Sequence, residues 1–461
     1  MKSKIILFIV AIVSLFLISF TINLDNLFNY ANQQIPAYIT KDNTGENTIT
    51  DEVATLGRVL FYDKSLSANN TKACASCHHQ ENAFGDLPVQ SEGLNGGLTG
   101  RHAMRLINSR FSDEVKFFWN ERATSLEDQS TKPIQDHVEM GFSGADGDPS
   151  ISDLIIILEQ KEYYQTLFQF AFGDTEITEN RMQLALAQFI RSIQSFDSKF
   201  DEGLAQTNNI NTNFPNYSAQ ENLGKNLFLT PPPQGGAMCF ICHRPPEFDI
   251  DPNTLNNGIV GVAGDLTDID VTNTKAPTLR DLVNPNGVPN GPFMHDGSKA
   301  TLLDVINHYN NVPDNAQNTN LDFRIGMMQN FMNLSTNDKN ALVAFLETLS
   351  GNDVYVNEKW SDPFSEDGSI TIINGTVSTQ EELFNQSVTI FPNPIEKQVT
   401  IDLVSGNYLI EIFSLNGKLI HKKTINGKTD LDLSFLAKGI FVLQIENLET
   451  KLTFTKKLIK K

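Results

Sequence analysis

The spacing of apolar residues divides the chain into a long helical part and a short C-terminal part built from strands. From Asp51 on, apolar residues recur at helical spacing (Val53, Leu56, Val59, Leu60), which predicts a helix with one buried face. Further helices are expected to open at Ser125–Gln129 and to cover 151–172, 182–196, 302–309 and 337–349. Residues 21–50 are polar and show no clear period, so we interpret them as a leader.

The apolar period changes to two after a polar, acidic linker over 352–386. Strands are predicted over 387–391, 398–404, 407–414, 418–424, 439–446 and 451–459. The pairs Asn416–Gly417 and Asn426–Gly427 are typical of hairpin turns. Residues 387–461 are therefore expected to form a small all-β Ig-like sandwich.

Two short motifs carry the candidate chemistry, and they use all 4 cysteines of the chain. Each has the pattern C-x-x-C-H, in which two thiols form thioethers with the haem vinyl groups and the histidine ligates the iron. The residues concerned are Cys74, Cys77 and His78 in the first motif, and Cys239, Cys242 and His243 in the second. We therefore expect two covalently bound haems c and no disulfide.

A weak internal repeat accompanies the two motifs. The sequence GRVLF at 57–61 is echoed by GKNLF at 224–228, and a haem motif follows each copy after a short turn. An Asn- and Thr-rich break over 208–216 separates the copies. The expected fold is mainly α, with cytochrome c-like haem domains over 51–215 and 216–351 ahead of the β sandwich.

The net charge and the N-terminal segment bear on the partners and the location of the protein. The 461 residues carry a formal net charge of −20, which argues against nucleic acid as a partner. Residues 388–461 differ from the rest, with 11 Lys against 7 Asp and Glu, which indicates a separate module. Residues 1–20, with Lys2 and Lys4 before an apolar run, read as an export signal, although an uncleaved anchor stays open.

Residues 51–351 resemble the di-haem cytochrome c peroxidase family, which includes the MauG-type enzymes. The segments that carry the resemblance are LGRVLFYDKSLSANNTKACASCH, FWNERATSLEDQ, PIQDHVEMG, CFICH, APTLRDL and FMHDGSKATLLDVI. The last segment resembles a type IX secretion C-terminal sorting domain, through FPNP at 391–394, FSLNGK at 413–418 and KGIFVLQI at 438–445.

The resemblance assigns roles to three further residues. In this family peroxide reacts at the first haem, and the positions that match its pocket residues are Glu139 and Gln129. A carboxylate over an open iron can take a proton from peroxide and return it to the departing oxygen. Trp119 matches a tryptophan between the haems, and electrons are implied to enter at the second haem from a donor such as a small cytochrome c.

The sequence also departs from the peroxidase pattern around both irons. Where many relatives carry a methionine ligand to the second iron, Tyr309 stands here as in MauG-type enzymes, with His308 as a competitor. A phenolate stabilises oxidised iron more than a thioether does. The loop Gly93–Gly100 lacks the histidine that often caps the first iron, so that iron is expected to be open, with His102 as the alternative ligand.

A calcium between the haems is a weaker implication of the resemblance, with carbonyl ligands around Asn290 and Pro292. The sequence therefore predicts a di-haem peroxidase that is exported to the periplasm and then secreted or displayed by the secretion machinery. A MauG-type oxidase of a protein or organic substrate and a non-catalytic electron-transfer cytochrome are the alternatives. The resemblance is also compatible with a homodimer.

Overall fold

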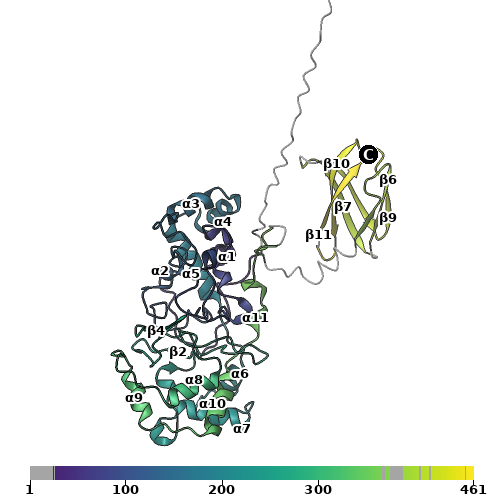
Figure 1. Cartoon of the computed structure of the whole chain (residues 1–461). Helices are drawn as coiled ribbons and strands as arrows, with labels where there is room; N and C mark the ends of the chain where they lie inside the picture. Colours follow the sequence, from purple (N-terminus) through teal and green to yellow (C-terminus); the bar gives the residue numbers. More distant parts are fainter. Residues whose placement is uncertain are drawn as a thin grey trace, which may run out of the picture. The chain divides into compact units, whose positions relative to one another are not determined.

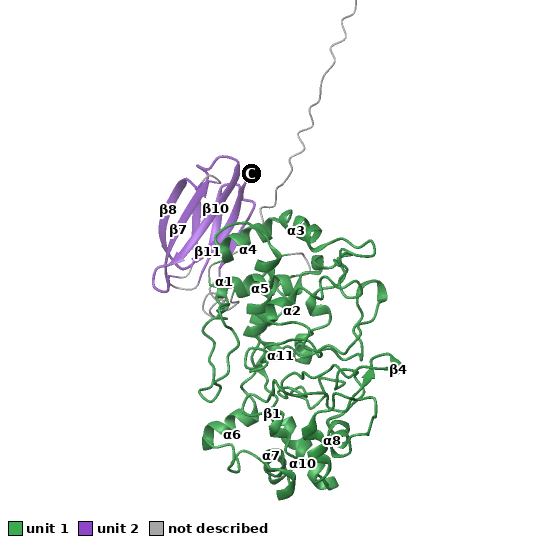
Figure 2. Ribbon diagram, turned by 90° about the vertical axis from the view of Figure 1, so that its left-hand side faces the viewer, with its two compact units in different colours: residues 1–373 green, residues 374–461 purple. Residues whose placement is uncertain are grey.

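A computed structural model describes residues 24, 26–365, 369–373, 388–403, 406–414, 417–451 and 453–461. The chain forms two compact units, residues 1–373 and 374–461 (Figures 1 and 2). The predicted export signal, residues 374–387 and Asn416 of the first predicted hairpin turn lie outside the described residues.

The first unit is helical, as the apolar spacing predicts. Its helices are α1 (Asp51–Tyr62), α2 (Leu126–Ser130), α3 (Ile151–Glu159), α4 (Glu162–Phe172), α5 (Glu179–Ser192), α6 (Lys199–Thr207), α7 (Ala219–Leu229), α8 (Leu302–Asn310), α9 (Phe323–Gln329), α10 (Thr336–Glu347) and α11 (Asp353–Val356). Two short hairpins accompany them, β1 (His243–Arg244) with β2 (Asp249–Ile250), and β3 (Gly261–Val262) with β4 (Asp265–Ile269). Side chains of Ser125, Ser150 and Thr178 cap α2, α3 and α5.

The internal repeat corresponds to two similar helix pairs, one in each half of this unit. Gly57 of α1 lies so close to α5 that a Cβ atom there would be 2.0 Å from the Ala185 carbonyl oxygen. Gly224 of α7 meets α10 in the same way, at 1.9 Å from the Ala341 carbonyl oxygen. Each glycine thus permits a helix crossing that any side chain would block. Each pair is the centre of a separate hydrophobic cluster.

Segments outside the two predicted haem domains also belong to this unit. The leader crosses both halves: Gln33 donates to the Ser192 carbonyl at 2.8 Å, and the Tyr38 hydroxyl donates to Asp201 of α6 at 2.7 Å. Helix α6 packs in the second cluster, ahead of the boundary expected at 215. Val354 and Trp360, which the sequence assigns to a linker, are fully buried in the first cluster. Their apolar side chains explain why this segment folds back onto the haem domain.

The second unit is a sandwich of a four-stranded and a three-stranded sheet, in the orders β11-β10-β7-β8 and β5-β6-β9. Its strands are β5 (Thr389–Phe391), β6 (Gln398–Asp402), β7 (Asn407–Ser414), β8 (Leu419–Asn426), β9 (Thr429–Asp432), β10 (Gly439–Asn447) and β11 (Thr453–Lys460). The expected fold class is confirmed. The prediction of a hairpin at Asn426–Gly427 is wrong, because β8 pairs with β7 whereas β9 pairs with β6 in the other sheet.

Candidate functional site

Two neighbouring cavities in the first unit open onto the two C-x-x-C-H motifs. The first cavity is lined by Cys77 and His78, and the second by Cys239, Cys242 and His243. All four cysteines are free thiols, so each pair is available for thioether bonds. Most of the residues around the second cavity are apolar, including Leu255, Leu279, Phe293, Val305, Ile325 and Met328, as the flat face of a porphyrin requires.

The histidine of the first motif is oriented as a ligand. Its Nδ1 lies 2.9 Å from the Phe84 carbonyl oxygen, and a carbonyl only accepts, so Nδ1 carries the proton. This leaves the lone pair on Nε2 for a metal. Burial lowers the pKa of His78 and lowers that of His243 to about 4, which keeps both rings neutral. The residues at both motifs therefore fit a covalently attached haem.

Glu139 lines the first cavity together with His78. The Asp136 side chain fixes its turn by accepting from the Val138 and Glu139 amides at 2.8 and 3.0 Å. The glycine-rich loop packs on the same turn, since a Cβ at Gly93 would be 2.1 Å from the Val138 carbonyl oxygen and the Leu94 amide donates to that oxygen. The loop thus packs against the backbone of the turn that carries Glu139.

Electrostatics give this carboxylate an unusual proton affinity. Burial raises the pKa of Glu139 to about 7; the negative charge of Asp136 also raises it, while the positive charge of Arg122 lowers it. Gln129, near the end of α2, lines the same cavity. The structure therefore brings together a carboxyl poised near neutrality, an amide and His78.

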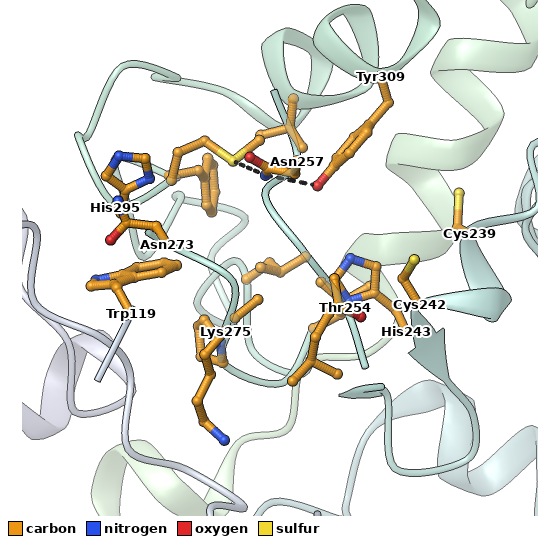
Figure 3. Close-up of a pocket in the computed structure, with 18 of the residues that line it drawn as sticks. Trp119, Cys239, Cys242, His243, Thr254, Asn257, Asn273, Lys275, His295 and Tyr309 are labelled. Atoms are coloured by element: carbon orange, nitrogen blue, oxygen red, sulfur yellow. Dashed lines mark hydrogen bonds between the residues drawn. The ribbon is translucent and has the colours of Figure 1, made fainter. Parts of the chain in front are cut away.

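Trp119 lines both cavities and belongs to the wall between them. Its indole nitrogen donates to the His102 carbonyl at 2.8 Å, and its own carbonyl accepts from the Thr274 and Lys275 amides. Its ring makes an edge contact with His295, with ring centroids 6.2 Å apart, on the side of the second cavity facing away from His243 (Figure 3). A π-system therefore forms part of the wall that the two cavities share.

Tyr309 of α8 points into the second cavity (Figure 3). Its hydroxyl accepts from the Asn257 side-chain amide at 3.1 Å, and the same amide lies 3.5 Å from Met294 Sδ. Burial raises the pKa of the free phenol well above its usual value, so only a bound cation would make it a phenolate. His308 bonds the Asn257 carbonyl through Nε2 and lines a different, surface pocket. Of the two candidates, Tyr309 faces the second cavity.

His102 lines both cavities, and its Nδ1 lies 3.0 Å from the Pro88 carbonyl oxygen. Near the predicted calcium ligands, Pro292 lines the second cavity, whereas the Asn290 amide nitrogen donates to the Asp281 carbonyl and the Tyr355 hydroxyl. No cluster of His, Cys, Asp and Glu suited to a metal occurs among the described residues.

Residues 51–209 match the family model of the di-haem cytochrome c peroxidases. The methylamine utilization protein MauG of Methylophilus methylotrophus is 31% identical over 314 residues, which cover 66% of this chain and 84% of that protein. The chain belongs to the di-haem cytochrome c peroxidase family. The cytochrome c551 peroxidase of Nitrosomonas europaea is 27% identical, over 65% of this chain and 80% of its own length.

A solved structure supports this assignment, and the C-terminal unit matches a separate domain family. A MauG-like protein associated with microbial copper homeostasis superposes with a TM-score of 0.58 at 27% identity, over 72% of this chain and 99% of its own. Residues 389–461 match the secretion system C-terminal sorting domain. Membership of the family implies two c-type haems and an oxidoreductase, and the sorting domain implies export. Among the described residues, no helix has the length and apolar character needed to cross a membrane.

Sequence reasoning missed several residues of the two cavities. Asn257, Arg105 and Lys275 line cavity walls, but none lies beside a haem motif in the sequence. The one available signal was that 275 immediately precedes the family segment APTLRDL. These residues reach the cavities only through the tertiary fold, which no local sequence pattern reveals.

Proposed function

We propose that this protein reduces hydrogen peroxide to water at the first haem, with electrons that enter through the second. The observation that carries the proposal is Glu139, a carboxyl with a pKa of about 7 in the same cavity as His78. A bound haem would supply the iron that binds peroxide and the electrons that reduce it. A group that titrates near neutrality is suited to moving protons under physiological conditions.

The side chains then divide the proton chemistry between them. As a carboxylate, Glu139 takes a proton from one peroxide oxygen, and as the acid it returns the proton to the departing oxygen, which leaves as water. Gln129 orients the peroxide by hydrogen bonding. Two electrons and two further protons complete the reduction to two water molecules. Trp119 carries electrons across the wall, and the acidic surface attracts a basic donor such as a small cytochrome c.

Stopped-flow absorbance of the fully ferric protein, mixed with one equivalent of peroxide, tests this proposal. Glu139→Gln is expected to slow the reaction by about 10²- to 10⁴-fold, the usual contribution of general acid–base catalysis. Glu81→Gln, at an exposed position outside both cavities, is the control and should react at the normal rate. Reaction only after one-electron reduction would assign His102 as a cap on the iron. No reaction in either state would favour an electron-transfer cytochrome.

A MauG-type oxidase is the second candidate, and the orientation of Tyr309 into the second cavity favours it. A phenolate ligand would let the second iron hold oxidising equivalents that are then consumed by a protein or organic substrate. Trapping experiments with candidate substrates and no cytochrome donor separate the two activities. Oxidation of such a substrate at the rate of peroxide consumption would replace the peroxidase proposal.

The same proposal includes a route to the outside of the cell. Residues 1–20 direct export to the periplasm, and the sorting domain directs secretion or surface display. Intact-mass measurement of the mature protein checks this route. Loss of residues after about 385 is expected after sorting, whereas a soluble product that retains them would contradict it.

A further inference from the structure

The wall between the two cavities is built from two chain segments that Trp119 joins. Residues 102–105 and 275–277 line both cavities, as Trp119 does. The Trp119 indole donates to the first segment and its carbonyl accepts from Lys275 of the second. Any group held by this wall is therefore close to both haem sites.

Two cationic side chains in this wall lack an anionic partner. Arg105 is 9% exposed; one guanidinium nitrogen donates to the Thr278 carbonyl at 3.0 Å, and its Nε has no hydrogen-bond partner among the described residues. Among the described residues, the Lys275 ammonium donates only to the Glu114 backbone carbonyl, at 3.4 Å, and it lies 4.8 Å from the centre of the Phe117 ring. Neither takes part in an ion pair within the described part of the chain.

At both cations the effect of burial outweighs the attraction of the nearby acidic groups. Burial lowers the pKa of Arg105 to about 10, although Tyr355 and Asp281 at longer range oppose the shift. Burial likewise lowers the pKa of Lys275 to about 8, against the charges of Glu114, Glu121 and Asp249. By contrast, Arg101, which lines only the first cavity, is paired with Asp270. A buried or half-buried cation without an ion-pair partner is destabilising, so an anion is expected at this wall.

We propose that Arg105 and Lys275 form one cationic site, shared by the two cavities, that binds the propionate carboxylates of the two haems. Each haem c carries two propionates, and no other anion needs to enter. The inference requires two bound haems but not peroxidase activity, so it can hold even where the proposed function fails. It implies that one set of charges adjusts the reduction potentials of both haems together.

Spectroelectrochemical titration of the full-length protein with both haems attached tests the shared site. Lys275→Met deletes the charge but keeps an apolar stem, and the lost positive charge favours ferric iron, so both midpoint potentials should fall. Lys275→Arg keeps the charge and should leave both potentials close to those of the unmodified protein. Lys116→Met deletes a charge from a lysine that lines neither cavity and should also leave them in place.

A second readout separates propionate binding from a merely structural role. In reduced-minus-oxidised infrared spectra, the propionate carboxylate bands should shift in Lys275→Met and not in Lys116→Met. Unchanged potentials in Lys275→Met, a shift at one haem only, or an equal shift in Lys275→Arg would each overturn the proposal. Lys275 is only half-buried, so its variants test the idea even if Arg105→Gln does not fold.

Discussion

At the scale of single residues, the surroundings of Glu139 determine when it can accept a proton. Burial and Asp136 hold its pKa near 7, far above that of an exposed glutamate, and Arg122 is the charge that opposes them. The group is a base only when ionised. The rate of reaction with peroxide should therefore rise as the pH increases through about 7 and level off above it.

Replacement of Arg122 tests this electrostatic account. Arg122→Gln removes the charge that favours the carboxylate, so the midpoint of the pH–rate profile should move to higher pH. Lys132→Gln removes a lysine that pairs with Asp128 and lines neither cavity, and should leave the midpoint in place. Peroxide rate constants measured across the neutral range would show both effects, and an unmoved midpoint in Arg122→Gln would exclude Glu139 as the titrating group.

Tyr309 carries a second prediction at this scale. Tyr309→Phe removes the hydroxyl that faces the second cavity and should raise the midpoint potential of the second haem, because a phenolate stabilises ferric iron. His308→Gln, at the adjacent position facing the surface pocket, should leave that potential unchanged. Redox titration of both variants decides which residue is the ligand. A raised potential in His308→Gln together with an unchanged one in Tyr309→Phe would make His308 the ligand.

At the scale of helices, two glycines set how closely each pair packs. Gly57→Ala places a Cβ atom 2.0 Å from the Ala185 carbonyl oxygen, so α1 must move away from α5. We expect a loss of about 1–3 kcal/mol or more in the free energy of unfolding. Gly326→Ala, inside α9 with open space around it, should instead stabilise the protein by about 0.5–1 kcal/mol through helix propensity. Denaturant titration of the two variants measures the contrast.

Local patterns in the sequence predicted most of the helices and strands. Contacts between residues that lie far apart in the sequence could not be predicted in this way. Thr178 caps α5 as its position before the apolar run suggests, and of the two possible caps for α3, Asp148 and Ser150, the structure uses Ser150. The single helix predicted over 151–172 is two, because the chain breaks at Gln160 and Lys161. Strand β9 was not predicted from the sequence. Among the cavity residues, the haem motifs were readable from spacing, whereas the partner of Tyr309, Asn257, is 52 positions away.

At the scale of the molecule, the catalytic unit extends beyond the two haem domains at both ends. Leader residue Tyr30 donates its hydroxyl to the Lys359 carbonyl at 2.5 Å, and Trp360 beside it is fully buried. The haem unit therefore needs its flanking segments, one from each side of the 51–351 region.

Replacement of Trp360 measures this dependence. Trp360→Ala should cost about 3–5 kcal/mol in the free energy of unfolding, the usual penalty for emptying a buried aromatic site. Phe323→Ala, at a side chain that is 71% exposed, should change the stability by less than about 0.5 kcal/mol. Equal stabilities of the two variants, measured by denaturant titration, would show that the segment after 351 does not support the haem unit.

The contact between Tyr30 and Lys359 also bears on the order of assembly. These residues are 329 positions apart, so the first part of the unit to emerge during synthesis must wait for the last before it can dock. Attachment of haem to both cysteine pairs can therefore precede this last contact. Haem attachment and the final closure of the fold would then occur in that order.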